Sequence, residues 1–379
     1  MFEVTALLVV LVVTVASSSA PTSPALSAGA PWLDTGDRDA VVAAYVQAFS
    51  IEIDPIEWDG DHRTCTPGSS SERSRRQTVE RVNFYRAMAG VPAVVTEDAT
   101  LSAGARAAAL MMSAQGELTH NPSTDFACFT VAGQRGAANS NLYLGRTGPA
   151  AIDGYIEDPG DDNTDVGHRS TILHPPTRRM GVGDIEGSTD GYAANALWVF
   201  DDHVFDEGPG SSALPPMREE DRFVAWPPRG YVPATLVHPR WSFTRAGVDL
   251  RGAEVTLHRL LPDGTAETIP STVVSRKGLP GHVPLPTLVW ETDIGPPPDT
   301  DTDYLVVITG VAPTPWSPSG SVPVPVPVAD PAPASAAVTP TVDDVPTVVA
   351  YTVRVMGRRP VAELTAGQFL ARLGSTITP

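Results

Sequence analysis

Positive charge is scarce in this sequence. It holds 26 Lys and Arg residues against 44 Asp and Glu residues, which gives a formal net charge of −18, and Lys277 is the only lysine. Proteins that bind nucleic acid or anionic membranes need clustered Lys and Arg side chains. The composition therefore argues against both kinds of partner, and we interpret the near absence of lysine as a coding bias.

Aromatic residues are also few, at 7% of the chain, although hydrophobic residues as a whole reach 42%. Cores with so few aromatic residues depend on Ala, Val, Leu and Met. The 379 residues suffice for two ordinary domains, each with a core of its own.

Long apolar runs are lacking except at the N-terminus. Residues 6–16 are apolar and are followed by the small residues Ser-Ser-Ser-Ala at 17–20. Such a run is too short for a comfortable membrane span and is typical of a signal peptide; a buried N-terminal strand or helix is the alternative. The C-terminus has neither an apolar tail nor a sortase-type motif. We therefore expect a secreted, extracellular protein without a transmembrane span.

Cysteine is limited to Cys65 and Cys128. Two cysteines in an exported chain most often pair, because the compartment is oxidising. The loop that they would close is long, so the chain-entropy model gives a stabilisation of roughly 4 kcal/mol at most. We predict a Cys65–Cys128 disulfide, with two free thiols as the alternative.

In the first half, segments with helical periodicity are followed by short apolar runs. Apolar stripes and cap residues predict helices at 39–49, 78–89, 98–115, 150–157 and 165–173. Residues 66–76, rich in Ser and Arg, are expected to form a loop. The many alanines of 98–115 predict close packing against a flat surface such as a sheet, and strands are expected at 180–185 and 193–200. Helices that flank a sheet in one unit indicate an α+β fold.

The second half changes to a period of two. The segments 254–260, 304–311 and 349–355 are β-prone, which predicts an antiparallel β-sandwich. Residues 206–222 have the composition of a linker. The Pro-rich insert 312–345 cannot form a central strand, because proline donates no hydrogen bond to a neighbouring strand. We expect this insert to be extended and disordered.

Several short segments of the first half occur in the order known from one protein family. They are Arg-Val-Asn-Phe-Tyr-Arg-Ala-Met-Ala-Gly at 81–90, Gly-Glu-Leu-Thr-His at 116–120, Asn-Ser-Asn-Leu at 139–142, Val-Gly-His-Arg at 166–169, Ile-Leu-His-Pro at 172–175, Met-Gly-Val-Gly at 180–183 and Ala-Asn-Ala-Leu-Trp-Val at 194–199. Their order and spacing resemble the CAP superfamily (cysteine-rich secretory, antigen 5 and pathogenesis-related-1 type, or SCP-like). The likeness is to bacterial secreted members that carry an Ig-like module after this domain, and residues 226–243 are similar to the start of that module.

The resemblance implies an α+β fold in which a CAP-type α-β-α sandwich precedes an antiparallel, Ig-like β-sandwich. Together with the periodicities it divides the chain into parts. These are a signal peptide 1–20, a flexible lead-in 21–38, a CAP domain 39–205, a linker 206–222, an Ig-like sandwich 223–357 with the insert 312–345, and a tail 358–379.

The resemblance also implies a binding cleft. In the family this cleft holds two histidines and two glutamates, and several members bind a divalent cation through the histidines. His120 and His168 match the two histidines. The resemblance therefore implies a metal site at His120 and His168 for an ion such as Zn²⁺ or Ca²⁺. The alternative is that both rings hydrogen-bond across the cleft without a metal.

The chain departs from the family at the first glutamate and offers two candidates for the second. Ser140, beside Asn141, stands where the first is expected, and Glu157 or Asp158 is the candidate for the second. Losing a carboxylate removes a candidate general base and a group that would orient a histidine. We place Ser140, Asn141 and Asp158 in the cleft with the two histidines. We assign no catalytic residue, since nothing marks an oxyanion hole for Ser140.

Residues 158–165 form a dense acidic segment. Closely spaced oxygen ligands are what Ca²⁺ prefers, but the spacing does not match an EF-hand loop. We interpret the segment as a solvated acidic loop.

These features favour a binding protein over an enzyme. We predict a monomeric extracellular recognition module for a lipid, glycan or protein ligand, with Zn²⁺ or Ca²⁺ as the candidate cofactor. The alternative is a metal-dependent hydrolase acting on peptide or cell-wall material, in which a cation at the two histidines activates water. A structural spacer at the cell surface is a third hypothesis, which leaves the histidine pair unexplained.

Overall fold

A computed structural model describes residues 32–49, 53–201, 223–246, 248–276, 285–313 and 348–357. These residues belong to one compact unit, Pro31–Pro379. None of the helices that they form is long and apolar enough to cross a membrane. The predicted signal peptide, the linker, the tail and nearly all of the Pro-rich insert lie outside the described residues and stay predictions.

Helices and strands are mixed in the first half, and strands dominate the second. The first half contains α1 (Arg38–Phe49), α2 (Glu72–Met88), β1 (Thr96–Glu97), α3 (Ala99–Gln115), α4 (Val131–Ala138), β2 (Ser140–Leu144), α5 (Gly148–Glu157), the 3-10 helix η1 (Asp161–Asn163), α6 (Gly167–Ile172), β3 (Arg179–Ile185) and β4 (Ala194–Trp198). The second half contains β5 (Val224–Trp226), β6 (Gly230–Pro233), η2 (Ala234–Leu236), β7 (Arg240–Thr244), β8 (Val248–Asp249), β9 (Glu254–Leu260), β10 (Ala266–Ile269), β11 (Ser271–Ser275), β12 (Thr287–Thr292), β13 (Thr302–Thr309), β14 (Ala312–Pro313) and β15 (Val348–Met356). This content confirms the α+β class.

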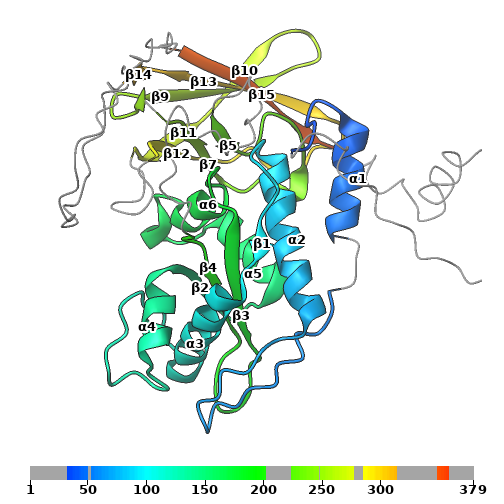
Figure 1. The fold of residues 1–379 in the computed structure, drawn as a ribbon. Helices are drawn as coiled ribbons and strands as arrows, with labels where there is room; N and C mark the ends of the chain where they lie inside the picture. The colour runs from blue at the N-terminus through cyan, green and yellow to red at the C-terminus, as the bar shows by residue number, and fades with distance from the viewer. Residues whose placement is uncertain are drawn as a thin grey trace, which may run out of the picture. The chain divides into compact units, whose positions relative to one another are not determined.

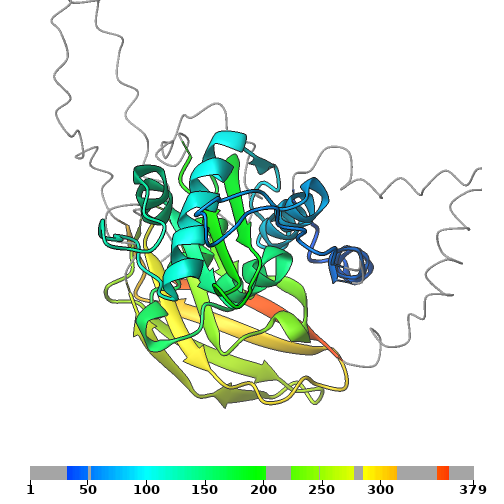
Figure 2. The ribbon, with the colours of Figure 1, turned by 90° about the horizontal axis from the view of Figure 1, so that it is seen from below.

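The first half is a three-layer sandwich around a sheet of strand order β1-β3-β4-β2. β1 pairs with β3 in parallel, and β4 is antiparallel to both β3 and β2. The helices α3 and α4 cover one face of the sheet, and α2 and α5, with α1 beside α2, cover the other (Figure 1; Figure 2). This is the α-β-α layering that we predicted.

α3 lies directly on the sheet, as its alanines predicted. Two glycines of β3 allow the close approach. A Cβ atom added at Gly181 would lie 2.3 Å from the carbonyl carbon of Leu101, and one added at Gly183 would lie 2.4 Å from that of Ala105. Side chains at these two positions would therefore push the helix off the sheet.

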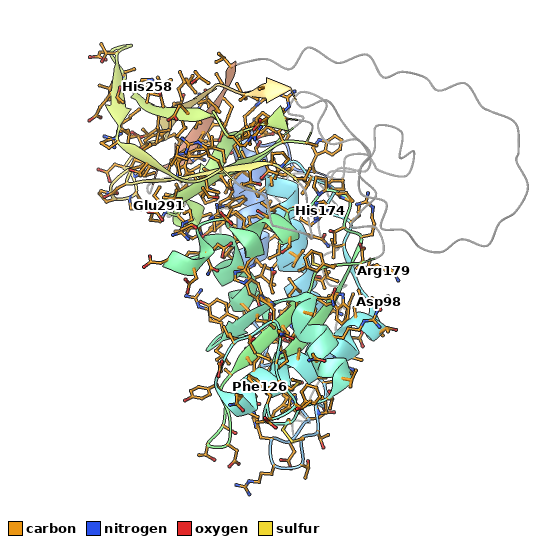
Figure 3. All side chains as sticks on the ribbon, turned by 90° about the vertical axis from the view of Figure 1, so that its left-hand side faces the viewer. Asp98, Phe126, His174, Arg179, His258 and Glu291 are labelled. Carbon is orange, nitrogen blue, oxygen red and sulfur yellow. A yellow bond between two sulfur atoms is a disulfide. The ribbon has the colours of Figure 1, made fainter. Side chains whose placement is uncertain are left out.

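The ends of α3 follow from its cap residues. The Asp98 carboxylate accepts hydrogen bonds from the N–H groups of Thr100 (2.8 Å) and Leu101 (3.0 Å), as an N-cap residue does. At the other end Gly116 has a φ of 74°, the left-handed conformation that commonly ends helices. Asp98 also pairs with Arg179 at the start of β3, at 2.9 Å (Figure 3).

α2 begins earlier than predicted, at Glu72 rather than at residue 78. The hydroxyl of Ser71 accepts the N–H of Ser74 at 3.3 Å and caps the helix. In the first turn Arg75 pairs with Glu97 at 2.8 Å. The prediction of a loop at 66–76 is therefore wrong from Glu72 onward, where the sequence is polar and lacks an apolar stripe. The Ser71 cap and the Arg75–Glu97 ion pair stabilise this first part of the helix.

Two sheets form most of the second half, with strand orders β10-β9-β13-β15-β6 and β11-β12-β7-β5. Aromatic rings pack between them, since Trp241 of β7 lies 6.2 Å from Trp290 of β12 and 6.4 Å from Tyr304 of β13. β15 and β6 pair in parallel, which differs from the antiparallel sandwich that we predicted. No hairpin joins these two strands, so nothing forces them to run in opposite directions.

The end of the predicted flexible lead-in, 21–38, is packed in this structure. Leu33 is buried, and its N–H bonds to the carbonyl of Ala87 at 3.1 Å. The carbonyl of Thr35 accepts the N–H of Tyr231 at 2.7 Å. The segment is therefore held by α2 and β6, through contacts with residues distant in sequence.

One hydrophobic core runs through both halves of the described unit. Val82 and Tyr85 of α2 belong to it, and so do Trp226 and Trp241 of the second half. The rings of Tyr85 and Trp226 lie 5.2 Å apart. A second core lies between the sheet and the helices α3 and α4. We expected each half to have its own core, whereas the first core is shared.

Candidate binding site

His168 and Asp158 form the best-defined pair at the candidate site. Nδ1 of His168 lies 2.8 Å from Oδ1 of Asp158. The Asp158 side chain is fully buried, whereas that of His168 is 23% exposed. A carboxylate only accepts hydrogen bonds, so we assign the ring proton to Nδ1. In the neutral ring Nε2 then carries the lone pair, and in the described part of the chain the only hydrogen-bond partner of the ring is Asp158 at Nδ1.

Asp158 follows α5 in the left-handed conformation. Its φ is 52°, which is uncommon for a residue other than glycine. Its N–H bonds to the carbonyl of Gly154 at 2.9 Å, and its Oδ2 accepts the N–H of Arg169 at 3.2 Å. Both carboxylate oxygens are therefore used inside the protein. Asp158 orients His168 and is not free to act on a ligand.

The backbone of His168 is held from β2. Nδ2 of Asn141 donates to the carbonyl of His168 at 3.0 Å. The hydroxyl of Thr171 lies 2.9 Å from the same carbonyl and 3.0 Å from Oδ1 of Asn141. Asn141 is 4% exposed, so it supports α6 from inside rather than presenting its amide to a ligand.

A buried polar chain lies behind the His168 ring. The ring of Tyr155 is 5.3 Å from it. The Tyr155 hydroxyl donates to Oδ1 of Asn195 at 2.8 Å, and Nδ2 of Asn195 donates to Oδ1 of Asp184 at 2.7 Å. Burial raises the pKa of both Tyr155 and Asp184. The hydroxyl therefore stays protonated at ordinary pH and keeps the Tyr155 ring in place.

His120 lies on the loop after α3 and is exposed. Its Nδ1 is 2.8 Å from the carbonyl oxygen of Ala137, near the end of α4. Ala137 belongs to α4, whereas Asn141, which holds the backbone of His168, belongs to β2. The two predicted histidines are therefore held from two elements that follow one another in the chain.

Ser140 is buried, with 3% of its surface exposed. It lies opposite Trp198 in the β2–β4 pair. Its hydroxyl has no hydrogen-bond partner among the described residues, so it lacks the adjacent base that a serine nucleophile needs. The geometry gives Ser140 no catalytic role.

Metal-binding side chains are sparse at the site. Within the described ranges no group of three or more His, Cys, Asp and Glu residues could hold a metal ion. A catalytic zinc site has three protein ligands, so the two histidines alone do not fit one. In the acidic segment, Asp161 and Asp162 of η1 are exposed, and Oδ1 of Asp165 accepts the hydroxyl of Ser275.

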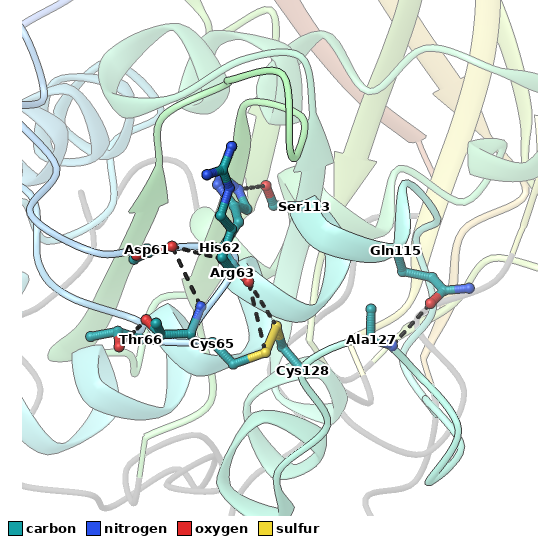
Figure 4. The surroundings of a disulfide bond; sticks show 10 residues. Asp61, His62, Arg63, Cys65, Thr66, Ser113, Gln115, Ala127 and Cys128 are labelled. Atoms are coloured by element: carbon teal, nitrogen blue, oxygen red, sulfur yellow. Dashed lines mark hydrogen bonds between the residues drawn. A yellow bond between two sulfur atoms is a disulfide. The ribbon is translucent and has the colours of Figure 1, made fainter.

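The predicted disulfide between Cys65 and Cys128 is present, with an S–S distance of 2.10 Å. It ties the loop around Cys65 to the segment that follows His120 (Figure 4). The two sulfur atoms lie 3.8 and 3.7 Å from the carbonyl oxygen of His62. The disulfide therefore restrains the loop that carries the exposed histidine.

The second half contributes contacts that sequence analysis missed. Arg240 of β7 donates to the carbonyl of Asp158 at 2.8 Å, and Arg169 donates to the hydroxyl of Ser242 at 3.1 Å. Asp158 and Arg240 are 82 positions apart, and no spacing rule connects them. The one sequence signal is the alternation along β7, in which polar residues are separated by Trp241 and Phe243.

Comparison with known proteins supports the family resemblance of the first half of the chain. Residues 79–201 match the model of the cysteine-rich secretory protein family, CAP. This range includes His120, the Asp158–His168 pair and all four strands of the first sheet. A comparison with curated proteins found no match for the chain.

Proposed function

The chain carries a CAP domain, and from this premise we propose that it is a secreted recognition protein that binds a glycan or a peptide at the surface around His120 and His168, without a reaction. The observation that carries the proposal is the orientation of His168. A buried carboxylate holds Nδ1, and Nε2 is left as a hydrogen-bond acceptor on a ring that is 23% exposed. A rigid polar group of this kind suits the recognition of hydroxyl and amide groups.

Secretion is supported by the disulfide. Cys65 and Cys128 are joined, and such a bond persists in oxidising compartments. The predicted signal peptide agrees with an oxidising compartment.

The test is binding of the purified, disulfide-bonded protein to glycan and peptide arrays. We expect wild-type hits to weaken about tenfold or more in His168→Gln, which loses the oriented imidazole. His258→Gln is the matched control, because His258 lies on β9 and contacts Thr268 at 3.2 Å, away from the CAP sheet (Figure 3). Hits that are the same in all three proteins, or no hits at all, would contradict the proposal.

One observation favours a second candidate, a hydrolase. The Asp158–His168 pair has the arrangement of a general base with its orienting carboxylate. The test is incubation with casein and with peptidoglycan, with and without added Zn²⁺, followed by mass spectrometry. If the wild type turns over a substrate and His168→Gln does not, hydrolysis replaces recognition as the proposed function.

A further inference from the structure

The segment between α5 and α6, residues 158–166, determines where the His168 ring lies. It begins with Asp158, which holds Nδ1 of His168, and it leads through η1 to α6. Asp158 has a positive φ without being glycine. Such a residue keeps this conformation only when its surroundings impose it. The contacts of this segment therefore decide whether the pair is held in place.

Arg240 of β7 makes most of these contacts. Its NH1 group donates to three carbonyls of the segment, those of Asp158 (2.8 Å), Gly160 (3.0 Å) and Asn163 (3.0 Å). The Arg240 side chain is only 10% exposed. A buried guanidinium shared by three carbonyls fixes the path of the segment, because each hydrogen bond is charge-assisted.

Arg240 is itself oriented by β12. Glu291 lies opposite it in the β7–β12 register. Oε1 of Glu291, which Figure 3 labels, accepts hydrogen bonds from Nε of Arg240 at 2.9 Å and from its NH2 group at 2.6 Å. The Glu291 carboxylate therefore binds the Nε and NH2 groups of Arg240, and the NH1 group remains available for the carbonyls of the segment.

Two more contacts join the segment to the second half. NH1 of Arg169 donates to the hydroxyl of Ser242 on β7 at 3.1 Å. The hydroxyl of Ser275 on β11 donates to Asp165. The segment is thus held near both of its ends by strands that the CAP match does not include.

We propose that the second half completes the binding site, with Arg240 as the residue that positions the Asp158–His168 pair. The consequence for ligand binding rests on the proposed function. The positioning itself does not, because it concerns the His168 ring alone.

The test is NMR of the ¹⁵N-labelled histidine rings in the full disulfide-bonded protein, with the His168 signals assigned from His168→Gln. In the wild type we expect a single tautomer, protonated at Nδ1, whose proton exchanges slowly with water. In Arg240→Met we expect that exchange to become about tenfold faster or the tautomers to mix, because the carboxylate loses its fixed position. Arg240→Lys keeps a cation at this place and should recover part of the effect.

Arg259→Met is the matched control. Arg259 of β9 also pairs with a glutamate, Glu267 at 3.1 Å, and donates to a backbone carbonyl, that of Ile294 at 3.0 Å. It makes no contact with the Asp158 segment, so the His168 signals should stay as in the wild type. An equal change in Arg259→Met would mean that any damage to the strands disturbs the ring, and would overturn the proposal.

Glu291→Ala keeps the proposal testable if Arg240→Met does not fold. It frees the guanidinium without removing it, and we expect a smaller change of the same kind at His168. Wild-type His168 signals in Arg240→Met, or in Glu291→Ala where Arg240→Met is unfolded, overturn the proposal. If the His168 signals change in Arg240→Met but the wild type binds nothing on the glycan and peptide arrays, the positioning role of Arg240 is supported and the proposed function is contradicted.

Discussion

Asp184 shows how one buried residue can set the response of the fold to pH. It lies near the end of β3, next to its last residue, with its side chain fully buried. Its Oδ1 accepts the N–H of Gly148 and Nδ2 of Asn195, both at 2.7 Å. Its Oδ2 is buried without a hydrogen-bond partner among the described residues. Burial raises the pKa of Asp184 because the charged form is poorly solvated, and the two hydrogen bonds only partly oppose this.

We predict that Asp184 lowers the free energy of unfolding as the pH rises. A raised pKa in the folded state means that the folded protein binds the proton more tightly than the unfolded chain. Stability is therefore lost between the ordinary Asp pKa near 4 and the raised value, by at most about 1.4 kcal/mol per pH unit. Urea unfolding between pH 4 and pH 7, compared in wild type and Asp184→Asn, measures it. The variant should lack this loss.

Asp98→Asn is the control of opposite sign. Hydrogen bonds from the Leu101 and Thr100 N–H groups lower the pKa of Asp98, with the nearby Arg179 adding to the effect. Its contribution to stability is therefore present at neutral pH and lost as the pH falls. Parallel pH curves for wild type and Asp184→Asn would contradict the prediction.

Single residues were predictable where local chemistry decides their role. The two cysteines pair as expected, and α3 (Ala99–Gln115) agrees with the helix predicted at 98–115. Sequence analysis left Glu157 and Asp158 as alternatives, and the structure places Asp158 on His168. That choice depends on the left-handed turn after α5, which no side-chain pattern shows.

At the scale of elements, the contact between α3 and β3 is the tightest constraint that we can test. The helix backbone lies where side chains of β3 would otherwise be. A Cβ atom at Gly183 would meet the carbonyl carbon and oxygen of Ala105 and the nitrogen of Arg106 within 2.5 Å. Backbone atoms of a packed helix cannot move aside as a flexible side chain does.

We predict that Gly183→Ala lowers the free energy of unfolding by about 1–3 kcal/mol, the usual cost of overpacking. Gly252→Ala is the matched control, because its Cβ atom would meet only the carbonyl oxygen of Gly310, at 3.9 Å. That variant should stay within about 0.5 kcal/mol of the wild type. Chemical denaturation measures both, and a Gly183→Ala protein as stable as the control would show that α3 can shift freely.

The elements themselves were predicted with uneven success. The alanines of α3 predicted its packing, because small side chains allow close approach. The first turns of α2 were missed, because charged and serine-rich sequence lacks the apolar stripe on which the prediction depended. The parallel pairing of β6 with β15 was missed because strand order depends on contacts far apart in the chain.

At the scale of the whole molecule, His238 lies where the two halves meet. It precedes β7, and its Nε2 is buried without a hydrogen-bond partner among the described residues. Burial lowers the pKa of His238 to about 4, and the charge of Arg169 adds to the effect. The ring is therefore neutral at ordinary pH, and protonation would place a second cation near Arg169.

We predict that acid weakens the fold through His238. The unfolded chain takes up a proton near pH 6.5 and the folded protein only near pH 4, so stability falls as the pH decreases through this window. The loss amounts to at most about 3 kcal/mol. Thermal unfolding between pH 4 and pH 7 should show it in the wild type and not in His238→Gln, which cannot take up the proton. Equal acid sensitivity in the two proteins would assign the effect to other groups.

The sequence by itself determined the α+β class, the family resemblance of the first half and the disulfide. Each depends on nearby residues: a periodicity, a cap, a motif or a pair of cysteines. Only the tertiary structure decided that one core joins both halves and that Asp158 holds His168. It also decided that Arg240, 82 positions away, holds Asp158. These contacts join segments that the chain brings together only when it folds, and a buried guanidinium or carboxylate shows its role only through the groups that surround it.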